Sequence, residues 1–385
     1  MERTIVHMDL DTFFVSCERL HNSSLEKIPV IIGGGDRGVV ASCSYEARFY
    51  GVRSAMPIKM ALKLCPEAKV IKGDMELYSK LSHTVTEIIE EKAPLVEKAS
   101  IDEHYLDITG MDKFFGAYRW TEELMNSVTQ HTGLPVSFAL SINKTVAKIG
   151  TGEAKPFGKK EIQQEQVKSF LSPLSIKKIP MVGDTTFRLL SRIGIRTIHT
   201  LADMPVHILQ QILGKNGLDL WKKANGIDYT AVEPYTERKS ISNEHTFDQD
   251  TTNTAMLKNL IAAMVEKLAY QLRSEQWLTS VVVLKLRYAN FDTETKQCQI
   301  TYTSADHILK QAVLDLFHKL YTRRMRIRLI GIRLTGLVRG NLQISLFENT
   351  EELIALYQAM DHIKNKFGDN KISRGFGFES ITKKQ

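Results

Sequence analysis

The order of strand and helix patterns in the N-terminal half limits the fold of this chain more than any other feature. A β-branched and apolar run at residues 4–8 predicts a buried strand. A helix pattern runs from Asp74 to about Glu91, and a hairpin, a second helix and another strand follow. This order is typical of a split β-α-β sheet with helices on one face. We expect the elements at residues 4–8, 74–91, 95–99, 104–108, 114–132, 136–142 and 144–153.

The remaining sequence predicts a small hairpin, a helical region and a second sheet. A strand at residues 30–32 runs into a glycine turn and returns at 39–43. Residues 170–233 contain short helices with glycine turns, and a charged linker follows at 235–239. The chain then again shows the order β-α-β-β-α-β. These last elements are expected at 240–247, 255–275, 278–288, 296–303, 307–324 and 327–337, with a further helix at 350–367.

Size and charge leave several classes of function open. The 385 residues suggest about two to four domains, and 43% apolar with 25% charged residues is typical of a soluble globular protein. The net charge of +7 fits a nucleic-acid partner, but it fits a basic enzyme with small substrates equally well. Charge alone therefore does not decide the function.

The cysteines and the first residues indicate a cytoplasmic protein. The four cysteines, Cys17, Cys43, Cys65 and Cys298, have neither metal-ligand spacing nor the density of a disulfide scaffold. The N-terminal residues lack the apolar stretch of a signal peptide, and no run of about 18 apolar residues predicts a membrane span. We therefore expect a cytoplasmic location with no membrane partner, and nothing in the sequence requires more than a monomer.

Two pairs of acidic residues lie at the ends of predicted strands. Asp9 and Asp11 alternate with Leu10, which would place both carboxylates on one face of a strand. Asp102 and Glu103 occupy the tip of the predicted hairpin. If the strands are neighbours, the carboxylates converge and repel one another unless cations lie between them. Two magnesium ions held there would suit in-line phosphoryl transfer, whereas solvated strand-end carboxylates would explain the same pattern.

Cationic side chains suited to a triphosphate occur elsewhere in the sequence. Tyr45 and Arg48 are three residues apart and share one helix face, so a hydroxyl and a guanidinium could hold phosphate oxygens together. Lys155, beside Pro156 at the end of a predicted helix, offers a further fixed cation. Taken alone, each of these residues fits an ordinary surface position as well.

Blocks of sequence over nearly the whole chain resemble the Y family of DNA polymerases. HMDLDTFFVSCE at residues 7–18 resembles the opening motif of that family, and SIDEHYLD at 100–107 resembles its catalytic hairpin. The other blocks lie at residues 41–48, 51–52, 56–57, 141–144, 147–148, 154–156, 179–183, 194–197, 239–242 and 246–247. They follow the order of the family, and the resemblance is closest to its bacterial type IV members.

The resemblance implies catalytic roles for the acidic residues. Asp9, Asp102 and Glu103 would be the catalytic residues and would ligate two Mg²⁺ ions, with the backbone carbonyl of Leu10 as a further metal ligand. His104 departs from the family pattern, which usually has a small or aromatic residue after the catalytic pair. We expect this histidine to be neutral and partly packed.

The resemblance also implies contacts with the incoming deoxynucleoside triphosphate. Phe14 would be the steric gate that rejects a ribose 2′-hydroxyl, although a core aromatic residue would fit the same position. The residues that would bind the triphosphate are Tyr45, Arg48 and Lys155. Val39 and Ala41 would cover the nascent base pair, and their small size would weaken selection against mismatches and admit damaged templates.

Contacts with primer-template DNA are expected from two further regions. Lys178, Val182 and Gly183 precede a helix whose first backbone amides would bind DNA phosphate, as helix-hairpin-helix elements do. Arg326 and Arg328 alternate on a predicted strand and would share a face that contacts phosphates. A solvated charge run is the alternative for these arginines.

A short peptide near the C-terminus suggests a protein partner. Residues 343–347, Gln-Ile-Ser-Leu-Phe, resemble the peptide by which bacterial polymerases bind the sliding clamp. Gln343, Leu346 and Phe347 would be its clamp-binding residues. The alternative is that Leu346 and Phe347 pack against the last domain.

The sequence and the resemblance together predict an α+β multidomain fold, a right-hand polymerase. The expected parts are a ferredoxin-like palm (1–10 and 75–165), fingers (11–74), a helix-hairpin-helix thumb (166–234), a linker (235–239), a β-α-β-β-α-β little finger (240–340) and a C-terminal tail (341–385). The implied function is template-directed, low-fidelity DNA synthesis with lesion bypass. Two alternatives stay open, another palm-type nucleotidyl transferase such as a nucleotide cyclase and an inactive DNA-binding scaffold.

Overall fold

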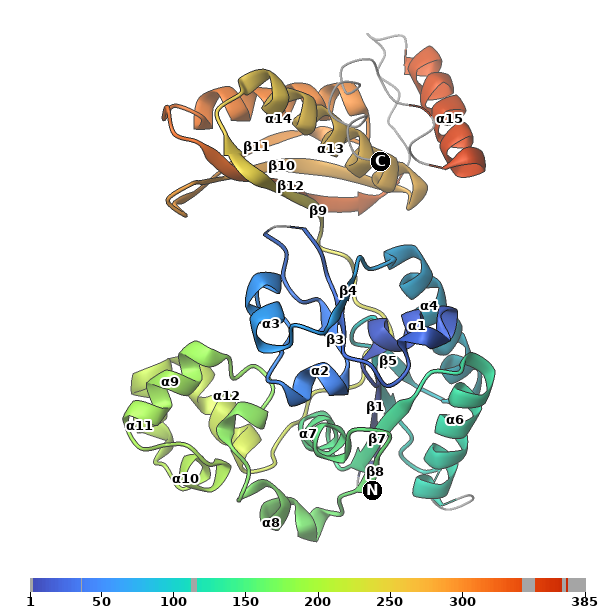
Figure 1. The fold of residues 1–385 in the computed structure, drawn as a ribbon, viewed down its shortest axis with the longest axis vertical. Coiled ribbons are helices and arrows are strands. Elements are labelled where there is room, and N and C mark those ends of the chain that lie inside the picture. Colours follow the sequence, from blue (N-terminus) through green and yellow to red (C-terminus); the bar gives the residue numbers. More distant parts are fainter. Residues whose placement is uncertain (1–2, 36, 112–115, 341–349, 369–371, 373–385) are drawn as a thin grey trace. The chain divides into compact units, whose positions relative to one another are not determined.

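The computed structural model describes residues 3–35, 37–111, 116–340, 350–368 and 372. The chain divides into two compact units, Met1–Thr236 and Glu237–Gln385. Among these described residues, the first unit contains two sheets and the second unit contains one, and helices pack against the sheets of both units (Figure 1). No helix within the described ranges is long and apolar enough to cross a membrane.

A five-stranded sheet forms the centre of the first unit. Its strands lie in the order β5 (Val96–Lys98), β6 (Glu103–Asp107), β1 (Ile5–Leu10), β7 (Val136–Ser141) and β8 (Lys159–Glu161). Every residue of β1 is buried, and β1 runs antiparallel to both β6 and β7. Successive side chains of β1 therefore enter opposite faces of the sheet.

Helices pack on both faces of this sheet. They are α4 (Met75–Lys92), α6 (Ala117–Thr132) and α7 (Lys144–Ala154). On one face, α4 and α6 share a core with Val6, Met8 and Leu10 of β1. On the other face, α7 approaches so closely that a Cβ at Gly150 would lie 2.8 Å from the Cβ of Ala139. The sequence predicted helices on one face only, and α7 is the exception because its small residues allow this close approach.

A three-stranded sheet lies between β1 and α4 in the sequence. Its strands and neighbouring helices are β2 (Val30–Ile32), β3 (Ser42–Cys43), β4 (Lys69–Ile71), α1 (Phe13–His21), α2 (Tyr45–Phe49) and α3 (Ile58–Leu64). The returning strand expected at residues 39–43 is limited to β3, because Val39 instead forms an isolated bridge with Pro57. β4 pairs parallel with β2 and was not predicted, since three residues are too few for an alternating pattern.

Short helices fill the last part of the first unit, as the sequence predicted. They are α8 (Val167–Leu171), α9 (Asp184–Arg192), α10 (Ile198–Ala202), α11 (Val206–Leu213) and α12 (Lys215–Ala224). Their apolar faces enclose a separate core that also includes Val146 and Ile149 of α7. The helical region therefore packs against α7, which in turn packs on the central sheet.

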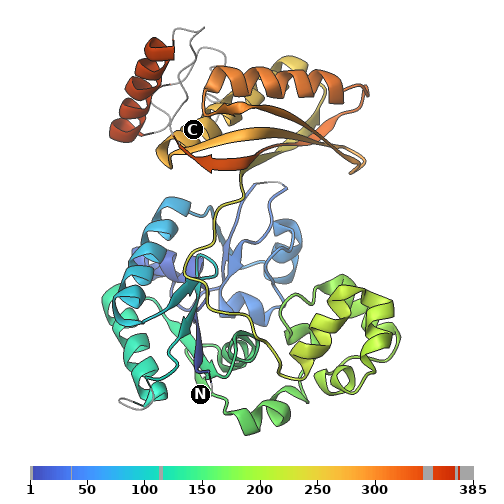
Figure 2. The same ribbon diagram turned by 180° about the vertical axis from the view of Figure 1, so that it is seen from behind.

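The second unit is a four-stranded antiparallel sheet with helices on one face, as Figure 2 shows from behind. Its elements are β9 (Ser240–Thr251), α13 (Thr254–Ser274), β10 (Trp277–Tyr288), β11 (Thr293–Thr303), α14 (Asp306–Leu320), β12 (Ile327–Arg339) and α15 (Thr350–Phe367). The strand order is β11-β10-β12-β9, and the elements follow one another along the chain in the predicted order β-α-β-β-α-β. α14 ends at Leu320, four residues earlier than predicted, and α15 packs through Tyr357 and Met360.

Candidate active site

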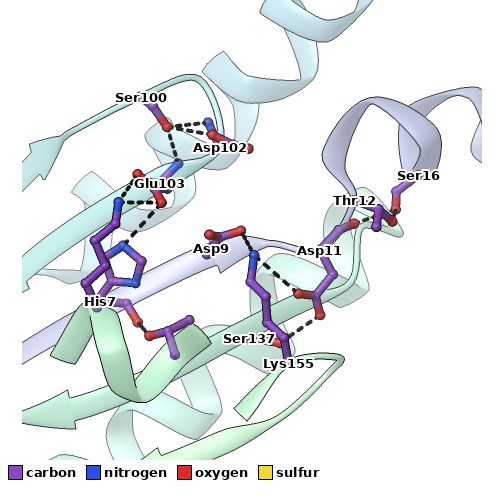
Figure 3. A network of polar contacts seen from close by, with 12 residues as sticks. His7, Asp9, Asp11, Thr12, Ser16, Ser100, Asp102, Glu103, Ser137 and Lys155 are labelled. Carbon is purple, nitrogen blue, oxygen red and sulfur yellow. Dashed lines mark hydrogen bonds and ion pairs between the residues drawn. The ribbon is translucent and has the colours of Figure 1, made fainter. Parts of the chain in front are cut away.

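The acidic residues of the two predicted pairs meet at one end of β1 and β6. Asp9 of β1 lies directly opposite Glu103 of β6, because the two strands pair in register. The next backbone contact, from the amide of Leu10 to the carbonyl of Asp102, is 3.0 Å long and closes the hairpin against β1. Figure 3 shows the resulting row of carboxylates, with Asp102 beside Glu103 and Asp9 facing them. Residues distant in the sequence are thus brought together by strand register.

Asp11 is the innermost carboxylate of the site. Its side chain is 2% exposed and accepts hydrogen bonds from Ser137 Oγ at 2.7 Å and from the backbone amide of Phe157 at 2.6 Å. The hydroxyl of Tyr45 lies 3.4 Å from its other oxygen. Asp11 therefore ties β1 to β7, to α2 and to the segment after α7, a structural role that the sequence did not indicate.

Two lysines neutralise the carboxylates nearest the hairpin. Lys155 Nζ forms an ion pair with Asp9 and lies 3.8 Å from Asp11, so Asp9 and Asp11 face the same cation (Figure 3). Lys148 Nζ lies 2.7 Å from both carboxylate oxygens of Glu103. Lys155 was expected to bind a triphosphate, whereas the contact between Lys148 and Glu103 was not predicted.

The electrostatics of Asp9 reflect a crowded acidic site. Burial raises the pKa of Asp9 to about 7, the attraction of Lys155 opposes this shift, and the negative charges of Asp102 and Glu103 add to it. A buried carboxylate beside two others is in an environment that a divalent cation would stabilise. The oxygen donors are of the type that Mg²⁺ prefers, so the residues fit such an ion.

In this structure, however, the carboxylates are not close enough together to form a complete metal-binding site. Among the described residues, no three His, Cys, Asp or Glu side chains lie close enough to hold a metal ion together. Asp9 is paired with Lys155, Glu103 with Lys148, and the Ser100 hydroxyl donates to Asp102 Oδ1 at 2.5 Å. Each acid is thus held by a partner of its own.

Two histidines of the sheet lie on opposite faces. His104 is buried on the α4 side, where its Nε2 lies 3.0 Å from Thr86 Oγ1, and burial together with Lys98 lowers its pKa to about 4. It is the neutral packed residue that we expected. His7 lies on the α7 side with its Nε2 3.8 Å from Glu103 Oε1, and burial, reinforced by Lys148, lowers its pKa. The sequence gave no signal for this neighbour of Glu103.

Three of the residues expected to bind the nucleotide lie on α1 and α2. Phe14 is half-buried and stacks on Tyr78, with ring centroids 4.5 Å apart at 13°. The Arg48 guanidinium lies over the Tyr45 ring at 5.1 Å, and its Nε donates to the carbonyl of Cys43 at 3.2 Å. Tyr45 and Arg48 therefore form one cationic and hydroxylic surface at the start of α2.

Val39 and Ala41 flank a residue that anchors their segment to the core. Both are exposed, and Val40 between them is 1% exposed. Because alternate side chains of an extended segment point in opposite directions, Val39 and Ala41 point away from that core. They form a small apolar surface next to β3.

The residues expected to contact DNA divide between the two units. Gly183 is the N-cap of α9 and follows Val182, while Lys178 forms an ion pair with Glu153 at 2.6 Å. In the second unit, Arg326 precedes β12 and Arg328 lies at a β-bulge, so they are not the regular alternating pair on a strand that the sequence predicted. Arg328 lies over the exposed ring of Phe291 at 4.5 Å.

The proposed clamp peptide lies outside the described part of the chain. Its contacts, Gln343, Leu346 and Phe347, fall within residues 341–349, which the structure does not describe. α15 follows this segment and is fixed to α13 and α14 through Arg273, Asp306 and Asp361.

Comparison with known proteins identifies the family. Residues 8–152 match the impB/mucB/samB family, and residues 238–346 match its C-terminal domain. The chain is 34% identical over 378 residues to DNA polymerase IV of Dehalococcoides mccartyi, covering 97% of both chains. It is 36% identical to DNA polymerase IV of Caulobacter vibrioides, covering 97% of this chain and 93% of that one.

A solved structure shows the same fold. A Y-family DNA polymerase chimera superposes with a TM-score of 0.77 at 23% identity, covering 88% of this chain and all of the other. The likeness extends to a mixed α/β architecture of several domains, as the sequence predicted. The sequence relatives and the fold together show that the chain belongs to the Y family of DNA polymerases.

Proposed function

We propose that this chain is a DNA-directed DNA polymerase that extends a primer by two-metal-ion nucleotidyl transfer, with low fidelity and tolerance of damaged templates. Its family supports the polymerase activity. The observation that carries the mechanism is the convergence of Asp9, Asp102 and Glu103 at one end of β1 and β6. Carboxylates brought together from β1 and from the hairpin at the start of β6 would hold divalent cations, which would supply charge stabilisation for phosphoryl transfer.

The metal ligands in this proposal are Asp9, Asp102, Glu103 and the backbone carbonyl of Leu10. When bound, two Mg²⁺ ions would activate the primer 3′-hydroxyl and stabilise the charge on the leaving group. The chain itself keeps the ligands in place. The register of β1 and β6 holds Asp9 opposite Glu103, and Ser100 holds Asp102 at the hairpin tip.

The triphosphate would bind to Lys155, Tyr45 and Arg48. Lys155 now contacts Asp9, so we propose that it exchanges this carboxylate for a phosphate oxygen when the substrate enters. Arg48 and Tyr45 offer a guanidinium and a hydroxyl from one face of α2, a combination suited to phosphate oxygens. These residues would orient the α-phosphate for in-line attack.

Sugar and base selection would depend on Phe14, Val39 and Ala41. Phe14 follows β1 closely and is held by stacking on Tyr78, so its position is fixed enough to exclude a 2′-hydroxyl. Val39 and Ala41 are small and exposed, and a base pair covered by such residues would be loosely enclosed. Weak contact with a distorted pair gives weak discrimination against it, which supports low fidelity and lesion bypass.

DNA would be held by parts of the chain outside this centre. We assign palm (1–10, 75–165), fingers (11–74), thumb (166–234), linker (235–239), little finger (240–340) and tail (341–385) as in the sequence prediction. The N-terminus of α9, after Lys178, Val182 and Gly183, would bind backbone phosphate. Arg326 and Arg328 would add phosphate contacts from the little finger, and the tail would bind the sliding clamp.

Primer extension tests this function directly. With Mg²⁺, four deoxynucleotides and a primed template, we expect templated extension, frequent misincorporation and synthesis across an abasic site. Formation of a cyclic product from a single nucleoside triphosphate would identify a cyclase instead. DNA binding without extension under these conditions would indicate an inactive scaffold.

A further inference from the structure

Helix α7 carries two lysines that make equivalent ion pairs with the sheet. Lys144 Nζ lies 2.7 Å from both carboxylate oxygens of Glu97, and Lys148 Nζ lies 2.7 Å from both oxygens of Glu103. Residues four apart share one helix face, so both lysines reach the same side of the helix. Glu97 lies in β5, away from the proposed metal ligands, whereas Glu103 is one of them.

The position of Lys148 is fixed by contacts that do not involve Glu103. One helical turn further along α7, Thr151 Oγ1 donates to the backbone carbonyl of His7 at 2.9 Å. Gly150 allows α7 to approach β7, and the side-chain oxygen of Asn143 caps the start of α7. The helix is therefore fixed over β1, and this places the Lys148 ammonium against Glu103.

Lys148 provides the direct charge compensation that the structure records for Glu103. The neighbouring His7 Nε2 is 3.8 Å from Glu103 Oε1, which is too far for a hydrogen bond. Both oxygens of the Glu103 carboxylate are engaged by one ammonium. A metal ion that ligates Glu103 would have to displace this contact.

We propose that Lys148 is a positioning residue that holds Glu103 in the metal-free enzyme and competes with the divalent cation for this carboxylate. The proposal rests on the function proposed above, in which Glu103 ligates a metal ion. Lys148 is suited to release the carboxylate, because its side chain is 33% exposed and a lysine ammonium is readily hydrated on a flexible stem. The ion pair keeps the acidic site compact until the cation and substrate arrive.

Because Lys148 and the metal ion compete for Glu103, removing Lys148 should raise the affinity of the protein for the metal ion. Without the ammonium, the carboxylates of the metal-free protein lose a compensating charge, and the metal-free state becomes less stable. The metal-bound state gains, because a positive charge next to the cation is removed. Linkage between the two states requires a higher affinity for the metal.

The test compares Lys148→Gln with the matched variant Lys144→Gln. Binding of Mn²⁺ to the protein alone is measured by calorimetry, and thermal unfolding is measured in chelator. We expect Lys148→Gln to bind Mn²⁺ about five-fold more tightly, the range for a partly exposed ion pair. The midpoint of thermal unfolding of Lys148→Gln in chelator should be lower than that of the wild type, and saturating Mn²⁺ should restore it. Lys144→Gln should also lower the midpoint in chelator but keep the wild-type Mn²⁺ affinity.

Two further variants distinguish an error in the role of Lys148 from an error in the proposed metal site. Lys148→Arg keeps the positive charge and should bind Mn²⁺ nearly as wild type does. Asp9→Asn should lose Mn²⁺ binding if the proposed metal site is correct. Equal or weaker Mn²⁺ binding by Lys148→Gln, with wild-type binding intact and lost in Asp9→Asn, overturns the role of Lys148 alone. Absence of Mn²⁺ binding to the wild type, or unchanged binding in Asp9→Asn, overturns the metal assignment and this proposal together.

Discussion

Arg273 of α13 donates two hydrogen bonds to Asp361 of α15, at 2.6 Å from Nε and 2.9 Å from Nη2. Its third nitrogen donates to Asp306 of α14 at 2.6 Å, so one guanidinium joins three helices. The Arg273 side chain is 11% exposed, and its guanidinium carbon lies over the ring of Tyr357. This contact fixes the helix that follows the proposed clamp peptide.

Replacing Arg273 with methionine should destabilise the second unit. The substitution leaves Asp306 and Asp361 partly buried without their shared cation, and breaking such a pair costs about 3–5 kcal/mol. Urea unfolding of the full chain measures this loss, and hydrogen exchange should show earlier exposure of α15. Arg323→Met is the matched control, because Arg323 also pairs with two carboxylates, Asp292 and Glu294, but is 46% exposed, so its loss should cost less than about 1 kcal/mol. Equal losses in both variants would contradict this account.

Alanine at Asp102 or Glu103 should abolish nucleotide incorporation. Each substitution removes a proposed metal ligand, and the loss of several kcal/mol of transition-state stabilisation corresponds to a rate decrease of about a thousand-fold or more. Primer-template affinity should stay near the wild-type value, because these acids repel the DNA backbone and do not bind it. Single-turnover extension and fluorescence anisotropy measure the two quantities. Extension near the wild-type rate by either variant would remove that acid from the catalytic centre.

Alanine at Phe14 should admit ribonucleotides. Phe14 is half-buried against Tyr78, so part of its ring is available to contact a sugar while the rest holds its orientation. We expect the efficiency ratio of ribonucleotide to deoxynucleotide insertion to rise, with deoxynucleotide extension largely kept. Steady-state insertion of single nucleotides measures the ratio. A lower unfolding midpoint with an unchanged ratio would make Phe14 a core residue only.

His104 should make the stability of the first unit depend on pH. Burial lowers its pKa to about 4, so the folded protein binds fewer protons here than the unfolded chain, whose histidine titrates near 6.5. The stabilisation is complete above about pH 6.5 and is lost as the pH falls toward 4, by about 2 kcal/mol at pH 5. Urea unfolding at several pH values should show a shallower dependence for His104→Gln. His83→Gln, at an exposed position on α4, serves as the control and should keep the wild-type dependence.

Alanine at both Leu346 and Phe347 should remove stimulation by the sliding clamp. These two side chains are the apolar anchors of the proposed clamp peptide, and a tether at the clamp raises the local concentration of polymerase at the primer end. Clamp-free extension should remain at the wild-type level. Extension with and without loaded clamp compares the two. Loss of clamp-free activity together with unfolding of the second unit would favour packing of these residues instead.

The sequence predicted the elements with clear periodicity and missed those defined by their neighbours. β1 is a β-branched and apolar run, the acidic hairpin is two short strands around its tip, and α13 is a long helical segment, so each could be recognised within one segment of the sequence. β8, with three residues and two lysines, is a strand only because β7 lies beside it, and no local pattern indicates this. α6 begins at Ala117, after Gly116 with its positive φ, and the start predicted at residue 114 lies outside the described residues.

In the candidate site, the sequence identified the acidic residues but not the residues that pair with them. The acids could be located at strand and hairpin ends from the sequence pattern, and the family resemblance supplied the prediction that they bind metal. Their pairing with Lys148 and Lys155 depends on how α7 crosses the sheet, which is a property of packing and not of spacing. His7 was missed for the same reason, because the sequence around a single histidine in a strand does not indicate which carboxylate will lie beside it.

Side chains of β1 alternate between the two faces of the sheet, so the number of residues in this strand decides which side chains reach the candidate active site. Met8 and Leu10 belong to the core beneath α4 and α6, while His7 and Asp9 lie on the α7 side. Loss of one residue within this strand would exchange the two sets, placing a carboxylate in the apolar core and a methionine among the lysines. A single-codon deletion here would therefore damage folding and chemistry at once.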